Sequence, residues 1–193
     1  MKGNLNIIAM IPARIGSTRL KMKNLALING KPLISYAIEA AKISGVFSKV
    51  VVNADNKIFA DIARRYGVDF YLRPSEIGSS TTKTDNVVYD FILKHSSDVV
   101  AWVNPISPLQ TGHEINEIIN YFVRNELDTL ITVKDEQVHC VYDRKPLNFK
   151  MEEVFAQTQD LKPVQSFVYS LMMWRNKTFI HAFEKQGYAL FCG

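Results

Sequence analysis

An apolar run that ends abruptly in a cationic loop is the feature that most limits what this chain can fold into. Residues 5–13 are nearly all apolar. A short apolar run bounded by turn residues is typical of a strand that is covered on both faces, as strands of parallel sheets are. The carboxyl end of such a strand opens into the crevice where α/β sheets bind ligands. The residues directly after this run are therefore the first candidates for a binding site.

The loop after the apolar run holds donors suited to a polyanion. Its cations are Arg14, Arg19, Lys21 and Lys23. Arginine can hold a phosphate through two parallel hydrogen bonds, and lysine acts as a point charge. Gly16 allows backbone amides to approach an anion, and Ser17 and Thr18 add hydroxyl donors. Four cations in a surface loop could also serve solubility alone, but their place after a buried strand favours a triphosphate-binding loop.

Strand and helix patterns alternate along most of the remaining sequence. The predicted helices are 32–44, 55–66, 85–95, 114–124 and 176–186, and the predicted strands after the first are 49–53, 68–72, 98–103, 129–133 and 188–192. This alternation predicts an α/β fold with a doubly wound, mostly parallel sheet of Rossmann-like nucleotide-binding topology. We expect residues 1–193 to form a single nucleotidyltransferase domain. Residues 134–175 break the rhythm and are expected to be an irregular dimerisation segment or an acceptor-side insertion.

Composition narrows the class of partner. The chain has 193 residues, with 23 basic and 19 acidic side chains and a formal charge of +4. This excess suits a small anionic ligand, and no basic stripe interleaved with aromatic residues indicates nucleic acid. Cys140 and Cys192 lack CxxC spacing and are expected to be packing residues in a reducing compartment. No leader or membrane-spanning pattern is evident, so cytoplasmic residence without membrane contact is the expectation.

Two known phosphate-binding motifs are missing from the first loop. It contains neither GxxxxGK[ST] nor GxGxxG, so neither a P-loop nor a dinucleotide-binding fingerprint is present. Residues 11–20 (IPARIGSTRL), Lys23-Asn24 and residues 29–34 (NGKPLI) instead resemble the amino-terminal signature of the acylneuraminate cytidylyltransferases, the CMP-sialic acid synthetases. The related CMP-Kdo synthetases share the Ser-Thr-Arg-Leu portion, and Lys23-Asn24 favours the sialic acid branch. The resemblance implies that Arg14 and Lys23 are catalytic and that the nucleotide site includes Ala13, Arg14, Gly16, Ser17, Lys23 and Asn24.

Two later stretches extend the implied nucleotide site. Arg73, in the run 72–76, matches a family element on the nucleotide side, although an ion pair with Glu76 is an equally good explanation. The short side chains of 78–85 precede a predicted helix, where hydroxyls cap the helix and main-chain amides face a ligand. In the family this region approaches the cytosine base, and Thr84 stands at the position of a base-contacting serine.

The acceptor side departs further from the family pattern. Residues 104–110 (NPISPLQ) resemble Gln-Pro-Thr-Ser-Pro-Leu-Arg, which implies that Asn104 and Ser107 bind substrate, although Ser107 could have a purely structural role. The family's Phe-Arg-x-Asn-Gly element has its nearest match at 166–171, with Val168 in place of the arginine that meets the sugar's carboxylate. Gln165 and Tyr169 are possible substitutes. Trp174 is a third, but the aromatic and Met-rich run 171–174 is more typical of a core or an interface.

The resemblance implies CMP transfer from CTP to a sialic-acid-like (nonulosonic) sugar acid, with release of pyrophosphate, Mg²⁺ as cofactor and a homodimer as the assembly. In the family an Asp-rich element near the carboxyl terminus supplies the Mg²⁺ ligands, and the sequence reaches Gly193 without it. The four histidines show no metal-ligand spacing either. We therefore expect a truncated or processed sequence. The alternatives are a CMP-Kdo synthetase, or a nucleotide-binding or dimerising module without turnover.

Overall fold

The computed structural model describes residues 5–17, 20–79 and 81–193. Thr18, Arg19 and Ser80 lie outside this set, so the roles that the sequence suggests for them stay predictions. The chain divides into two compact units. Unit 1 contains residues 1–130 and 170–193, and unit 2 contains residues 131–169.

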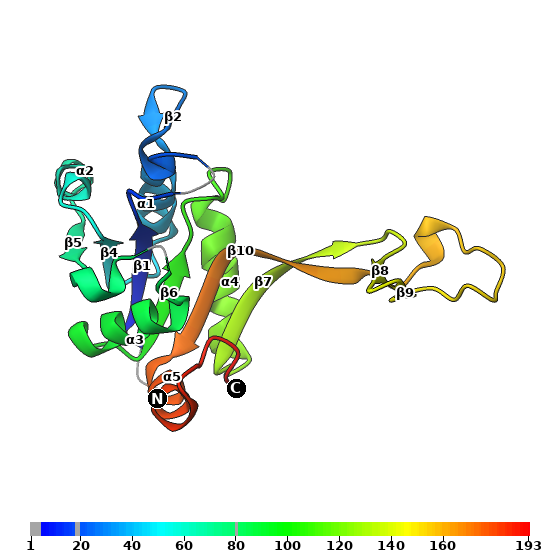
Figure 1. The fold of residues 1–193 in the computed structure, drawn as a ribbon. Coiled ribbons are helices and arrows are strands. Elements are labelled where there is room, and N and C mark those ends of the chain that lie inside the picture. Colours follow the sequence, from blue (N-terminus) through cyan, green and yellow to red (C-terminus); the bar gives the residue numbers. More distant parts are fainter. Residues whose placement is uncertain (1–4, 18–19, 80) are drawn as a thin grey trace. The chain divides into compact units, whose positions relative to one another are not determined.

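A six-stranded sheet organises the fold. Its order is β5 (Asp69–Leu72), β4 (Lys49–Ala54), β1 (Ile7–Ala13), β6 (Val99–Val103), β10 (Val164–Arg175) and β7 (Thr129–Glu136) (Figure 1). Strands β5, β4, β1 and β6 pair in parallel, and β10 is antiparallel to β6. The prediction of an α/β fold with a mostly parallel sheet is confirmed. Since β1 lies between two parallel neighbours, its carboxyl end opens near the middle of that sheet edge.

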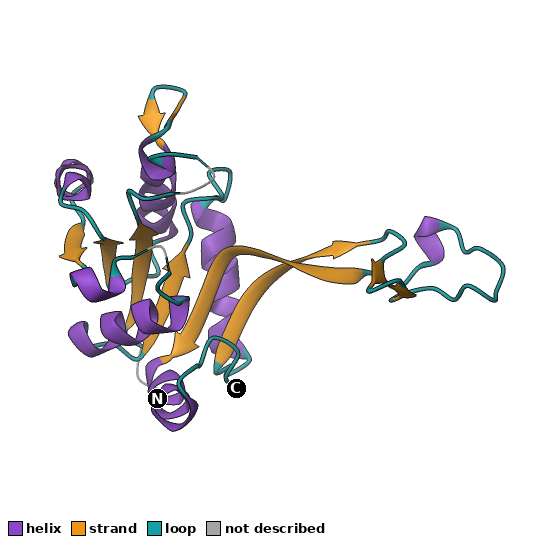
Figure 2. Cartoon of the chain, in the orientation of Figure 1, coloured by secondary structure: helices purple, strands orange, loops and turns teal. Residues whose placement is uncertain are grey.

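Helices cover both faces of the sheet in unit 1 (Figure 2). They are α1 (Leu33–Ser44), α2 (Ile58–Tyr66), α3 (Thr84–Lys94), α4 (Gly112–Arg124) and α5 (Asn176–Gln186). Alternate residues of β1 point to one face, where Ile7, Ala9 and Ile11 pack in one buried cluster with Ile38 of α1 and Ile119 of α4. Helices α3 and α5 pack against each other.

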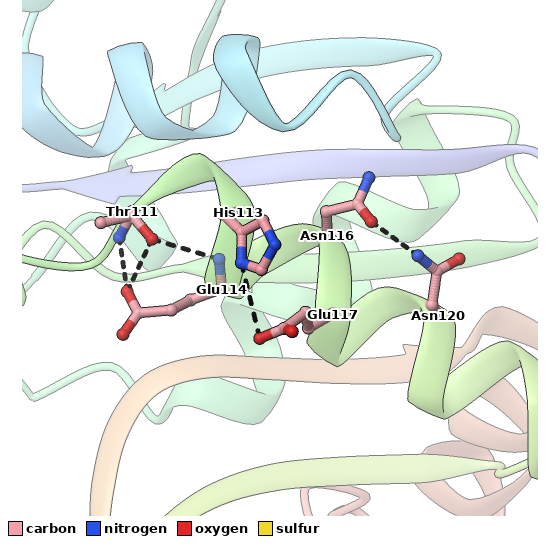
Figure 3. A network of polar contacts seen from close by, with 6 residues as sticks. All are labelled: Thr111, His113, Glu114, Asn116, Glu117 and Asn120. Atoms are coloured by element: carbon pink, nitrogen blue, oxygen red, sulfur yellow. Dashed lines mark hydrogen bonds and ion pairs between the residues drawn. The ribbon is translucent and has the colours of Figure 1, made fainter.

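Helix α4 begins two residues earlier than predicted because a capping box fixes its start (Figure 3). The Glu114 backbone N–H donates to Thr111 Oγ1 (3.1 Å), and the Thr111 backbone N–H donates to Glu114 Oε2 (2.7 Å). A Cβ on Gly112 would stand 2.8 Å from Ile43 Cγ2, so only glycine allows α4 to start this close to α1.

Two expectations for the second half of the chain are wrong. The predicted closing strand 188–192 is an irregular turn, because its backbone groups bond to side chains instead of to a neighbouring strand. The segment 134–175 is not irregular throughout, because it contains most of β10, whose residues Leu171–Arg175 pair with β6. Its role as a dimerisation segment or acceptor-side insertion stays a prediction. Leu171 to Trp174 are all buried, so this Met-rich run is part of the core.

The start of α2 also differs from the prediction of residue 55. The Ile58 backbone N–H donates to Asn56 Oδ1 (2.9 Å), so residues 55–57 form the turn ahead of the helix. Asp55 is thereby left outside α2, with its carboxylate available to another segment.

Unit 2 consists of the outer parts of β7 and β10, the hairpin of β8 (Val141–Tyr142) with β9 (Lys145–Pro146), and the short helix η3 (Thr158–Asp160). Asn148 joins its parts: its Oδ1 accepts from the Cys140 N–H (3.0 Å), and its Nδ2 donates to the carbonyls of Val138 (2.9 Å) and Lys162 (3.0 Å). None of the helices in the described ranges is long and apolar enough to cross a membrane.

Candidate functional site

A cavity of about 390 Å³ lies in unit 1 at the carboxyl ends of β1 and β6. It is lined by Pro12, Ala13, Arg14, Ser17, Lys23, Asn24, Arg73, Ile77, Gly78, Ser79, Thr82, Thr84, Val87, Trp102, Asn104 and Ile106. Three of these residues are cations, and none of them carries a carboxylate. A cavity of this size at this sheet edge matches the usual ligand sites of α/β folds.

The loop after β1 is anchored from two sides. Asp55, directly after β4, accepts the Ile15 backbone N–H on both carboxylate oxygens (2.9 and 3.3 Å). Asn24 Nδ2 donates to the Arg14 carbonyl (3.3 Å), and Asn24 is 5% exposed. Asn24 belongs to the short helix η1 (Lys23–Leu25), which also brings Lys23 to the cavity. These contacts hold the backbone on either side of Arg14, so its guanidinium extends from a fixed point.

Arg73 follows β5 and is 9% exposed. Its guanidinium donates to the Ala13 carbonyl at the end of β1, and its backbone N–H donates to the Ala54 carbonyl (2.8 Å). Its Nε–H finds no acceptor among the described residues. Burial lowers the pKa of the guanidinium from its usual value, the charge of Asp55 opposes this, and Arg14 adds to it. The alternative ion pair with Glu76 is not formed, so a buried donor remains for an anion.

Hydroxyl groups gather between η2 (Ser75–Ile77) and α3. Ser79 Oγ lies 2.9 Å from the hydroxyls of both Thr81 and Thr82. The N-cap residue of α3 is Lys83, whose side chain makes no capping hydrogen bond, so the predicted hydroxyl cap is wrong at the N-cap position. Thr84, the first residue of α3, lines the cavity. The Asn86 backbone N–H donates to the Lys83 carbonyl (3.2 Å), so a main-chain bond closes the start of α3 at the point where Thr84 reaches the cavity.

The end of β6 supplies the less polar part of the lining. Trp102 pairs in register with Met10 on β1 and Met172 on β10, and its buried indole N–H has no acceptor in the described part of the chain. Asn104 follows two residues later, on the same face. Its backbone N–H donates to the Ser170 carbonyl (3.0 Å), which fixes the loop that it begins.

Most of the residues predicted for the nucleotide site, and one of those predicted to bind the acceptor substrate (Asn104), meet at this cavity. Those that line it are Ala13, Arg14, Ser17, Lys23, Asn24, Arg73, Thr84 and Asn104. Gly16 is not among the lining residues; a Cβ there would meet no atom of the described residues within 4 Å, so these residues do not require glycine at this position. Ser107 also lies outside the lining, and its backbone N–H donates to the Asn104 carbonyl (3.3 Å), which supports the structural alternative.

The predicted acceptor residues Gln165 and Tyr169 belong to unit 2. Gln165 Nε2 donates to Asp135 Oδ1 (3.2 Å), and Tyr169 has a positive φ of 53°. Their proposed contact with an acceptor stays a prediction.

Sequence reasoning missed Trp102, Ile77 and Val87 as lining residues and Asp55 as an anchor of the first loop. The alternation along β6 was the available signal for Trp102, since it places this side chain on the same face as Asn104.

The described residues form no cluster of metal-binding side chains. Among them no group of three or more His, Cys, Asp or Glu side chains is close enough to hold one. Mg²⁺ therefore stays a prediction from resemblance.

The combination of three cations, short hydroxyl side chains and an aromatic residue suits a ligand with a polyanionic part and a planar part. Together with the parallel sheet, the site defines a nucleotide-binding α/β protein. Comparison with known proteins makes this class more specific. Residues 8–173 match the family described as Cytidylyltransferase. The chain belongs to the cytidylyltransferase family.

Relatives of two kinds are found. One is the N-acylneuraminate cytidylyltransferase of Escherichia coli O18:K1:H7, which is 38% identical over 122 residues, covering 60% of this chain and 28% of that protein. Another is the 3-deoxy-manno-octulosonate cytidylyltransferase of Bdellovibrio bacteriovorus, 32% identical over 190 residues, covering 86% of this chain and 74% of that protein. The chain thus spans less than a third of the length of the first relative.

A solved structure shares the fold. The CMP:2-keto-3-deoxy-manno-octonic acid synthetase in complex with CTP superposes with a TM-score of 0.69 at 16% identity, covering 94% of this chain and 78% of that one.

Proposed function

We propose that this chain transfers CMP from CTP to a sialic-acid-like (nonulosonic) sugar acid and releases pyrophosphate. The observation that carries the proposal is the cavity at the end of β1, which has three cations and no carboxylate among its described lining residues in a chain of the cytidylyltransferase family. A triphosphate is the part of CTP that such a lining would stabilise most.

The proposed roles follow from where each side chain lies. Arg14, Lys23 and Arg73 neutralise the triphosphate, and Ser17 and Asn24 lie beside it. Thr84 and Asn104 also line the cavity. Thr84 is proposed to contact the cytosine base, and Asn104 is proposed to contact the acceptor sugar. Gln165 and Tyr169 are proposed to assist with the acceptor.

The proposed reaction is a single displacement. The hydroxyl oxygen of the sugar acid forms a bond to the α-phosphorus of CTP. The bond from that phosphorus to the bridging oxygen breaks, pyrophosphate leaves, and the hydroxyl proton passes to solvent. The protein then acts by positioning both reactants and by stabilising the charge that builds up on the phosphates. Mg²⁺ is proposed as a cofactor, and no step is assigned to it because no cluster of three or more metal-binding side chains is found among the described residues.

Transfer to Kdo is the second candidate. It is favoured by the 3-deoxy-manno-octulosonate cytidylyltransferase of Bdellovibrio bacteriovorus, which matches 86% of this chain. The sialic acid branch is favoured by Lys23-Asn24 and by the higher identity to the Escherichia coli relative. The acceptor is the discriminating reactant, so the assay must vary it.

Pyrophosphate release tests the proposal. The protein is incubated with Mg²⁺, with each of CTP, ATP, GTP and UTP, and with a panel of nonulosonic acids and Kdo. We expect release with CTP and a nonulosonic acid and its loss in Arg14→Ala. Arg64→Ala is the matched control, because Arg64 is 82% exposed on α2 and pairs with Asp61.

Each other outcome of this assay has a separate meaning. Release with Kdo alone would establish the second candidate. No release, with CTP still raising the melting temperature, would identify a nucleotide-binding module without turnover. If neither effect is seen, the proposed function is wrong.

We also propose that the chain forms a homodimer through residues 134–175. Much of this segment is exposed, including the apolar side chains of Tyr142, Val154 and Phe155. Sedimentation over a range of concentrations tests this, and a monomer throughout would contradict it.

A further inference from the structure

The first turn of α3 is tied to the turn that follows α5. Thr84, which starts α3, lines the cavity, and the next residue, Asp85, is 9% exposed. Asp85 Oδ1 accepts two backbone N–H groups, from Ala189 (2.6 Å) and Leu190 (3.0 Å). A carboxylate that accepts two backbone donors makes strong, charge-assisted hydrogen bonds. The cavity end of α3 is therefore attached to a segment more than 100 residues away in the sequence.

That segment is itself held in place. The indole Nε1–H of Trp174 donates to the Leu190 carbonyl (2.9 Å), and Trp174 is fully buried on β10. The Thr129 hydroxyl, at the start of β7, donates to the Cys192 carbonyl. Ala189 has no exposed surface. Asp85 thus accepts hydrogen bonds from a backbone segment that is itself held by β10 and β7. These hydrogen bonds can therefore set the position of the first turn of α3.

Other contacts hold α3 further from the cavity. Tyr89 stacks on Phe183 of α5 with ring centroids 4.3 Å apart, and its hydroxyl donates to Glu184 (2.9 Å). Asp90 accepts the Tyr71 hydroxyl (2.8 Å). Tyr89 and Asp90 lie more than one helical turn beyond Thr84, so their contacts orient the body of α3. The hydrogen bonds of Asp85 act on the first turn.

We propose that Asp85 is a positioning residue of the nucleotide site, and that the turn 187–192 belongs to that site through it. This inference rests on the proposed function. Asp85 holds the first turn of α3 so that Thr84 keeps its place in the cavity lining. Small displacements of positioning groups are costly, because binding and catalysis depend on distances held to a fraction of an ångström.

If Asp85 acted only through its charge, replacing it would change the CTP affinity in the opposite direction. A carboxylate beside a cavity for an anion repels that anion, so removing the charge would tighten nucleotide binding. Positioning predicts that removing the acceptor weakens binding even though the repulsion is lost. Asp85→Asn separates the two, because it keeps one oxygen acceptor of the same length and removes the charge.

The experiment measures CTP affinity by calorimetry, well below the melting temperature of each variant. Relative to the unchanged protein, we expect the dissociation constant to rise about tenfold in Asp85→Ala and to stay within about threefold in Asp85→Asn. Tyr89→Phe is the matched control, because it removes a hydrogen bond from the same helix away from the cavity. Its affinity should not change.

Asp85→Glu provides a second variant if Asp85→Ala does not fold, since it keeps the charge but moves the oxygens. It should also bind CTP about tenfold more weakly. Unchanged affinity in the folded Ala or Glu variants would overturn the inference, and so would tighter binding in both Ala and Asn. Failure of the unchanged protein to bind CTP would instead refute the proposed function, and this inference with it.

Discussion

Replacing Arg73 by methionine is the most informative perturbation of the cavity. Arg73 is 9% exposed, donates to the Ala13 carbonyl and keeps a buried Nε–H without an acceptor among the described residues. Methionine keeps much of the side-chain volume and removes the charge. The folded protein loses a hydrogen bond worth about 1.5–3 kcal/mol but no longer buries a cation, so we expect the free energy of unfolding to change by less than about 1.5 kcal/mol.

The effect of Arg73→Met on CTP binding should be larger than its effect on stability. A hydrogen bond between a guanidinium and a phosphate is worth about 1.5–3 kcal/mol, which corresponds to a rise of roughly 10- to 150-fold in the dissociation constant. Calorimetry with CTP measures this, and the salt dependence of binding should become weaker in the variant.

Arg64→Met controls for the loss of a positive charge elsewhere, because Arg64 is 82% exposed on α2. Its CTP affinity should equal that of the unchanged protein. A dissociation constant for Arg73→Met within twofold of the unchanged value would refute the assignment of Arg73 to the triphosphate.

Three further predictions concern the loop, the sheet and the response to pH. Asp55→Ala leaves the Ile15 N–H without its acceptor, so we expect weaker CTP binding and a loss of about 1–3 kcal/mol of stability, measured by calorimetry and by urea unfolding. Leu171→Ala should cost about 2–5 kcal/mol in urea unfolding because Leu171 is fully buried on β10, whereas Leu109→Ala, at a side chain that is 90% exposed, should cost almost nothing. Burial lowers the pKa of His95 below its usual value, so the folded protein binds this proton less readily than the unfolded chain, and stability should fall as the pH drops below about 6.5. Thermal unfolding at several pH values measures that slope, which should be shallower in His95→Gln; an equal slope would show that His95 is not responsible.

Local patterns were enough to predict much of the fold. The apolar run 5–13 and its cationic loop contain β1 and the first binding segment within one stretch of sequence, so no knowledge of the sheet order was needed. Helix α5 (Asn176–Gln186) has the predicted bounds because its periodicity is regular and Gly187, with φ of 77°, ends it.

The errors have a common physical cause, which is that distant segments decide the local structure. Residues 188–192 are apolar enough for a strand, but Asp85 and Trp174 take their backbone hydrogen bonds. The run 171–174 is apolar at every position, so hydrophobic periodicity cannot show whether it is a strand or a helix. Its pairing with β6 makes it a strand. Likewise, Asp55 and Trp102 reach the site because β4 and β6 lie on either side of β1 in the sheet. This strand order cannot be read from the local sequence patterns.

The most direct test of the central claim is a crystal structure of the protein with CTP. The account predicts that the triphosphate lies in the cavity after β1, with phosphate oxygens within hydrogen-bonding distance of Arg14, Lys23 and Arg73, and that the base lies near Thr84. A nucleotide bound elsewhere, or a triphosphate in this cavity that contacts none of the three cations, would contradict it.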